Sequence, residues 1–174
     1  MQGEPISLGG AIVQNNIKND VSFILNSEIS LYEHQSTYNP NMPLLEFIYF
    51  ACLYHAYAEQ NKSNVYGNTL VKIPNPHYIV FYNGTKEMPD RMELKLSDAF
   101  LKTENDIRYE WTAVMLNINH GRNQKLMENC EILHNYAEFV QLTREYRKTT
   151  DVNDAISNAI DDTVKKIIHY TISL

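Results

Sequence analysis

The sequence is poor in cysteine, glycine and proline, with two, six and six of them among 174 residues. Two cysteines are too few for the disulfide framework of a small secreted domain, and both lie in stretches with helical spacing. We therefore expect Cys52 and Cys130 to be free thiols in a reducing compartment. The shortage of glycine argues against a phosphate-binding glycine-rich loop, and Ser97 has no glycine elbow that would make it a nucleophile.

Long apolar runs are also missing. No stretch reaches the roughly 18 apolar residues that cross a membrane. The first residues lack the basic and apolar regions of a signal peptide. The sequence therefore predicts a cytoplasmic location and no membrane partner. With 174 residues, 44% of them hydrophobic, the chain can form one domain with a sizeable core.

Positive charge is scarce, since the chain has 15 lysines and arginines but 21 acidic residues, and its net charge is −6. Binding to DNA needs lysine or arginine at the phosphates, so it would depend on a local basic groove. The candidate positions for such a groove are Lys18, Lys72, Lys86, Arg91, Lys95, Lys102, Arg122 and Lys125. An ordinary solvated surface of mixed charge is the alternative explanation for most of them.

The six histidines are scattered, and no cysteine or histidine pair has the spacing of a zinc site. His120 precedes Gly121 and Arg122 on a predicted turn, where it would reach a phosphate or simply face solvent. Another turn is predicted at Asn83-Gly84, with a positive φ at the glycine.

The most informative segment runs from Asp20 to Gln35. Two short alternating apolar runs flank the polar pair Asn26-Ser27, which is typical of a β-hairpin. A turn at this pair places Asp20 directly opposite Glu33. Gln35 then projects from the same face as Glu33, because residues i and i+2 share a face of a strand. Like charges in opposite positions are destabilising, so such a pair usually has a cation to neutralise it.

Oxygen ligands of this kind suit Mg²⁺, or another divalent cation such as Mn²⁺ or Ca²⁺. Asp20 and Glu33 would be the ligands, with the backbone carbonyl of His34 as a third. A metal so held lowers the pKa of a bound water and stabilises charge on a phosphodiester under attack. Gln35 can orient the water or a phosphate oxygen, but an amide cannot act as a cation or a general acid. Alternatively, Asp20 caps the strand and Glu33 lies on a solvated face, which is the commoner origin of so short a motif.

The rest of the chain alternates between strand and helix patterns. The predicted elements are strands around 11–14, 77–82, 94–96 and 109–118 and helices over 43–60, 123–148 and 152–170, in addition to the hairpin over 20–36. The near-continuous apolarity of 109–118 predicts a strand buried on both faces. Asp151 is a predicted N-cap, and Asn41 is another. We expect an α/β fold with a central mixed sheet, the 43–60 helix packed on it, and an antiparallel C-terminal helical hairpin.

Several blocks resemble one family. The run LYEHQSTYNPNMPL, from Leu31 to Leu44, is similar to the Rpn family of recombination-promoting nucleases, also described as transposases, in the PD-(D/E)XK nuclease superfamily. Further similar blocks are KNDVSF at 18–23, VFYNGT at 80–85, LKLSDAF at 94–100, LNIN at 116–119 and the helix from 123 to 139. The resemblance implies a restriction-endonuclease-like domain over 1–148, with a C-terminal helix in 149–174 packing on it.

The same resemblance implies a magnesium-dependent hydrolase that cuts double-stranded DNA and is linked to mobile elements or recombination. Its catalytic positions would be Asp20, Glu33 and Gln35. Gln35, however, stands where the superfamily usually has lysine, and Leu45 stands where the family has an arginine suited to phosphate contact. Residues 1–17 do not resemble the family's N-terminal helical segment, as expected of a copy truncated there. Two interpretations stay open, namely an active endonuclease and an inactive remnant that binds DNA or protein.

A third, weaker interpretation comes from the last predicted helix. Its apolar positions are Val152, Ala155, Ile156, Ala159, Ile160, Val164, Ile167 and Ile168, which form a stripe along one side. Such a stripe is typical of a helical hairpin that dimerises, so a homodimer is the third prediction.

Overall fold

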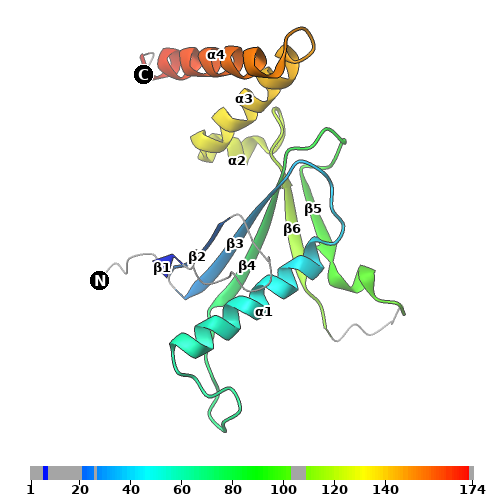
Figure 1. Cartoon of the computed structure of the whole chain (residues 1–174), viewed down its shortest axis with the longest axis vertical. Coiled ribbons are helices and arrows are strands. Elements are labelled where there is room, and N and C mark those ends of the chain that lie inside the picture. Colours follow the sequence, from blue (N-terminus) through cyan, green and yellow to red (C-terminus); the bar gives the residue numbers. More distant parts are fainter. Residues whose placement is uncertain (1–5, 8–20, 26, 103–108, 173–174) are drawn as a thin grey trace.

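The computed structural model describes residues 6–7, 21–25, 27–102 and 109–172 (Figure 1). The strands are β1 (Ile6–Ser7), β2 (Val21–Leu25), β3 (Glu28–Gln35), β4 (Asn75–Tyr82), β5 (Arg91–Lys95) and β6 (Thr112–Asn117). The helices are α1 (Met42–Gln60), the short 3₁₀ helix η1 (Leu96–Ala99), α2 (Gln124–Asn129), α3 (Glu131–Tyr146) and α4 (Val152–Ile172). The strand expected around 11–14 lies outside the described residues. In the described part of the chain, no helix combines the length and apolarity needed to cross a membrane.

The strands form one six-stranded sheet in the order β1-β2-β3-β4-β6-β5. The central strands β3, β4 and β6 run parallel, whereas the remaining neighbours are antiparallel. The parallel pair β3 and β4 needs a long crossover, and α1 supplies it. The predicted α/β architecture with a mixed sheet is therefore confirmed.

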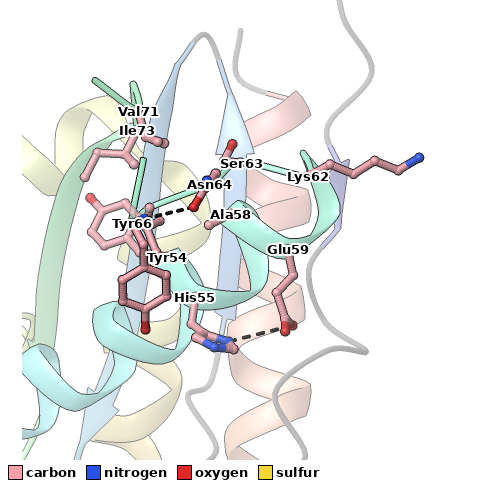
Figure 2. Close-up of a pocket in the computed structure, with 11 residues that line it drawn as sticks. Tyr54, His55, Ala58, Glu59, Lys62, Ser63, Asn64, Tyr66, Val71 and Ile73 are labelled. Carbon is pink, nitrogen blue, oxygen red and sulfur yellow. Dashed lines mark hydrogen bonds and ion pairs between the residues drawn. The ribbon is translucent and has the colours of Figure 1, made fainter. Parts of the chain in front are cut away.

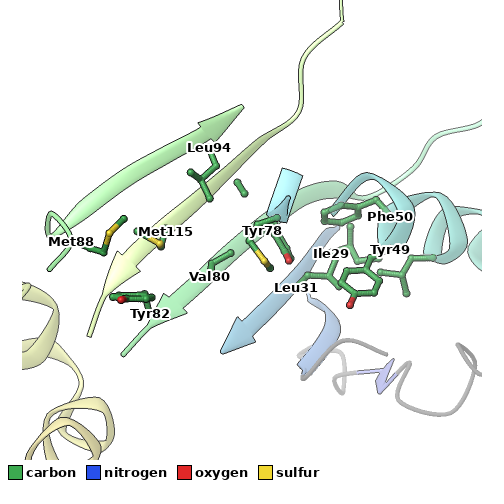
Figure 3. Packing of buried hydrophobic residues seen from close by; sticks show 13 residues of the cluster. Ile29, Leu31, Tyr49, Phe50, Tyr78, Val80, Tyr82, Met88, Leu94 and Met115 are labelled. Atoms are coloured by element: carbon green, nitrogen blue, oxygen red, sulfur yellow. The ribbon is translucent and has the colours of Figure 1, made fainter. Parts of the chain in front are cut away.

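Helix α1 covers one face of this sheet. It begins at Met42 with Pro43 in the first turn, where a missing N–H costs nothing, and it ends close to the predicted residue. Asn41 occupies the N-cap position without a side-chain cap bond. The main core lies between α1 and the sheet (Figure 3). Its largest fully buried members include Phe50, Leu31, Val80 and Tyr82.

The opposite face of the sheet is less well covered. In β6, Ala113, Met115 and Asn117 are buried, whereas Thr112, Val114 and Leu116 alternate with them and stay half-buried. The prediction that this strand is buried on both faces was therefore wrong. The strand is apolar because it lies between β4 and β5 in the sheet. On the face opposite α1, only the end of the strand is covered, by α2 and α3. There a smaller cluster joins Ile118, Met127 and Ala137 to Phe81 and Tyr136.

The C-terminal segment forms the predicted helical hairpin, with one change. The single helix expected over 123–148 breaks at Cys130, whose φ of −140° and ψ of 87° are not helical. Beyond the break, α4 folds back along α3, and Lys166 Nζ lies 2.6 Å from Glu138 Oε2. Asp151 caps α4 as predicted, because its Oδ1 accepts hydrogen bonds from the N–H groups of Asn153 and Asp154. Helix α4 lies farthest from the sheet (Figure 1).

Gly84 is needed for a reason other than the predicted one. It is not among the described residues with positive φ, which are Ser27, Lys62, Gly121 and Asn123. Instead, a Cβ at Gly84 would lie 2.5 Å from the carbonyl oxygen of Ser36 and would also overlap the hydroxyl of Tyr82. The loop after β4 is thus pressed against the loop after β3, and only glycine fits between them.

Candidate functional site at the carboxyl edge of the sheet

The carboxyl ends of β3, β4 and β6 meet at one edge of the sheet, beside α2 and α3 (Figure 1). In open α/β sheets this edge is where ligands usually bind, because the loops that leave parallel strands gather there. Glu33, His34 and Gln35 are the last three residues of β3 and lie at this edge. The predicted site therefore lies where the topology of the fold favours one.

The hairpin has the predicted register. Leu25 pairs with Glu28 across the turn, and the ladder continues to Val21 opposite Tyr32. Asp20, the predicted partner of Glu33, lies outside the described residues. The structure confirms the register of the hairpin only from Leu25–Glu28 to Val21–Tyr32.

The last three residues of β3 project from two different faces of the sheet. Glu33 is only 8% exposed and lies beside Val80 of β4, on the face that carries the main core. Gln35 follows on the same face beside Tyr82 and is half-buried. His34 projects from the other face, and its ring packs edge-on against Tyr136 at a centroid distance of 5.7 Å. A cation bound by Glu33 could therefore be coordinated by the backbone carbonyl of His34 but not by its side chain.

The chemistry of these groups fits a hard divalent cation. A largely buried carboxylate and a neighbouring amide present oxygen atoms and no sulfur or imidazole, which is the donor set that Mg²⁺ prefers. Among the described residues, no three histidine, cysteine or acidic side chains form a metal-binding group.

The predicted basic positions differ in what surrounds them. Arg122 lies 3.3 Å from Glu87 and 3.5 Å from Asp90, and Arg91 lies 2.8 Å from Glu93. These arginines are paired with carboxylates and do not make a basic groove. The side chains of Lys72, Lys95, Lys102 and Lys125 are exposed, and Lys18 lies outside the described residues.

Lys86 is connected by its contacts to residues at the carboxyl edge of the sheet. The hydroxyl of Tyr82 donates a hydrogen bond of 2.9 Å to the carbonyl oxygen of Lys86, and Tyr82 is the register partner of Gln35. The Lys86 ammonium group lies 4.9 Å from the centre of the Tyr38 ring, in the loop that follows β3. Lys86 therefore belongs to the carboxyl edge, on the side of the sheet that carries Glu33 and Gln35.

His120 was expected to reach a phosphate or to face solvent. Its side chain is 49% exposed, so the expectation that it faces solvent is confirmed. Its Nδ1 also lies 3.5 Å from Oε1 of Glu138 on α3, and the same carboxylate holds Lys166.

A polar network at the same edge was not predicted from the sequence. Arg144 of α3 donates to Asn119 Oδ1 at 2.8 Å and to the carbonyl oxygen of Asn83. Asn83 in turn donates through Nδ2 to the Tyr136 hydroxyl at 3.0 Å, and that hydroxyl lies 3.1 Å from Nε2 of His34. Burial raises the pKa of Tyr136, so the hydroxyl is protonated at neutral pH. The network fastens α3 across the ends of three strands.

Removing the hydroxyl at the centre of this network should loosen α3. We expect Tyr136→Phe to lower the free energy of unfolding by about 1–2 kcal/mol, because Asn83 Nδ2 loses its acceptor while Asn83 stays buried. Urea denaturation measures the change, and Tyr66→Phe is the matched control because Tyr66 is 96% exposed. Equal stability of the two variants would contradict this role of Tyr136.

A hollow of about 450 Å³ lies elsewhere, at the amino end of β4 (Figure 2). It is bordered by the last turns of α1 and by the loop that follows, including Tyr54, His55, Tyr66 and Ile73. Tyr54 is fixed there, since its hydroxyl donates a 2.8 Å hydrogen bond to the Pro74 carbonyl oxygen, and burial raises its pKa to about 12. The His55–Glu59 pair at its rim is solvent-exposed. These groups secure the loop and do not form a catalytic constellation.

No family model, curated protein or solved structure matches the chain.

Proposed function

We propose that the chain is a divalent-metal-dependent endonuclease of double-stranded DNA. The observation that carries the proposal is the register of the β2–β3 hairpin from Leu25–Glu28 to Val21–Tyr32, which is the register from which the sequence predicts Asp20 opposite Glu33. The burial of Glu33 at the carboxyl edge supports it, and so does the resemblance of the surrounding sequence blocks to Rpn nucleases. The restriction-endonuclease-like identity of the mixed sheet belongs to the same proposal.

In this proposal each residue has a distinct task. Asp20 and Glu33 hold a Mg²⁺ ion, with the His34 carbonyl oxygen as a further ligand. The bound ion would supply an acidified water and neutralise charge on the phosphodiester. Gln35 orients a water or a phosphate oxygen through its amide, beside Glu33 on the same face.

Lys86 provides the positive charge that Gln35 cannot. Superfamily members usually have lysine at the position of Gln35, and here the loop after β4 brings a lysine to the same edge and the same side of the sheet. Its ammonium group lies over the Tyr38 ring and is suited to contact a DNA phosphate.

Cleavage of supercoiled plasmid DNA tests the proposal. The wild-type chain is expected to nick or linearise plasmid with Mg²⁺ or Mn²⁺ and to stop when the metal is chelated. Asp20→Ala and Glu33→Ala should each lower the rate at least about a hundredfold, because each removes a metal ligand. Glu28→Ala is the matched control, since Glu28 lies at the other end of β3 and half of its side chain is exposed. Cleavage that survives both site substitutions would reject the site.

A second candidate is a nuclease-like fold that binds DNA or protein without cutting. The observation that favours it is Gln35, which leaves the site without the usual lysine. Its signature would be DNA binding in a fluorescence anisotropy titration with no cleavage under any divalent metal. If Lys86 contacts phosphate in either case, Lys86→Ala should reduce the slope of log affinity against log salt by about one, whereas Lys62→Ala should not.

A further inference from the structure

We propose that α4 is the docking surface for a second copy of this chain, paired antiparallel through an outward-facing apolar stripe. The stripe consists of Val152, Ile156, Ile160, Val164 and Ile168, whose side chains are 47, 37, 47, 46 and 52% exposed. It is independent of the proposed nuclease site, because α4 lies beyond α3 on the side away from the sheet (Figure 1).

The distribution of side chains on α4 is the reverse of that expected for a helix that only covers α3. The positions that face the protein are small, since Ala155 and Ala159 are fully buried and Thr163 is nearly so. The large aliphatic side chains stand next to them on the solvent side. An amphipathic helix normally buries its large apolar residues and exposes its polar ones. A sequence that turns its large aliphatic side chains outward in this way favours a partner surface there.

The centre of the stripe suits another helix. With 100° per residue, Ile156, Ile160 and Val164 project within 40° of the middle of one face. Val152 and Ile168 lie at the two borders of that face, near the ends of the helix. A second amphipathic helix laid along this face would bury all three central side chains and part of the two at the borders.

Charge identifies the second helix as another α4 and gives its direction. Asp154, Asp161 and Lys165 lie along one flank, within about 40° of one another at 100° per residue, with the acids toward the amino end and the lysine toward the carboxyl end. In a parallel copy related by a twofold axis, the two charged flanks would lie on opposite sides of the helix pair, so the lysine of one would not meet the acids of the other. An antiparallel copy related by a twofold axis brings each lysine to the acidic part of the other flank, and each surface then serves both copies.

The flank charges are available for such pairing. Lys165 lies 3.2 Å from Asp162 in its own helix, but this pair is exposed and of the i, i+3 type, which contributes little. Lys166, by contrast, is held by Glu138 of α3. Lys165 is therefore the lysine that can turn to a partner. One helix face is small for an interface, so we expect a dimer with a dissociation constant in the micromolar range.

Sedimentation equilibrium on the full chain tests the proposal. The wild-type mass should rise from 20.2 kDa toward twice that value as concentration increases through the micromolar range. Ile160→Asp should remain monomeric at concentrations where the wild type is mostly dimeric, with its circular dichroism unchanged. Leu101→Asp is the matched control, because Leu101 is fully exposed outside α4 and should leave the dimer intact.

A charge reversal tests the orientation even if Ile160→Asp disturbs folding. Lys165→Glu should weaken the dimer several-fold at low salt and much less at high salt, because it puts a third acid on the flank. Lys62→Glu, the same change in an exposed loop, should have no effect. A wild-type chain that stays monomeric, or a dimer unaffected by Ile160→Asp, would overturn the proposal. A dimer insensitive to Lys165→Glu would overturn the antiparallel arrangement.

Discussion

Mg²⁺ is expected to raise the free energy of unfolding of the wild-type chain and to leave that of Glu33→Gln unchanged. A ligand that binds only the folded state adds about 2.7 kcal/mol when its concentration is a hundred times its dissociation constant. Glu33 is largely buried near the end of β3, and the sequence predicts Asp20 opposite it. Glutamine keeps the size of the side chain but removes the charge that attracts the ion. Urea denaturation with and without Mg²⁺ measures both values.

The same comparison separates a metal ligand from a carboxylate that only supports the fold. Without metal, the stability of Glu33→Gln relative to the wild type gives the reference from which the effect of Mg²⁺ on each chain is measured. Glu28→Gln provides the control on the same strand, and Mg²⁺ should stabilise it as it does the wild type. If Mg²⁺ stabilises Glu33→Gln equally, Glu33 is not a ligand, whatever the plasmid assay shows.

The hairpin could be predicted because its information is local. The alternating apolar residues fix which side of each strand is buried, and the two-residue turn at Asn26-Ser27 fixes the register. The observed pairs from Leu25 with Glu28 to Val21 with Tyr32 follow from these two constraints alone. Helix α1 is similar, since Pro43 and the apolar spacing mark it without knowledge of its neighbours.

The polar network at the carboxyl edge could not be predicted in this way. Asn83 and Arg144 are separated by 61 residues, and nothing in either local pattern refers to the other. The break at Cys130 changes the direction of the chain between α2 and α3, and periodicity gave no sign of it because apolar spacing continues across it. Likewise, the apolar stripe of α4 could be predicted from the sequence. Which of its residues would face α3 and which would face solvent could not be predicted.

Glu46 of α1 is a buried acid that no pattern in the sequence singles out. It is 4% exposed among the core residues of α1, and its Oε2 has no hydrogen-bond partner in the described part of the chain. Burial raises the pKa of this carboxyl group from 4.5 to about 8. In the folded chain Glu46 is therefore mostly protonated at neutral pH, whereas in the unfolded chain it is ionised.

This difference should make the chain less stable as the pH rises. The folded state holds a proton that the unfolded state releases above pH 4.5, so the stabilisation is complete below pH 4.5. It is lost progressively as the pH rises toward 8, by about 3–5 kcal/mol in all. Glu46→Gln cannot ionise, so its stability relative to the wild type should grow by that amount between these pH values. Urea denaturation at several pH values measures the difference, with Glu59→Gln as the control because Glu59 is exposed on the same helix. A difference between Glu46→Gln and the wild type that stays constant with pH would show that Glu46 is ionised in the folded chain.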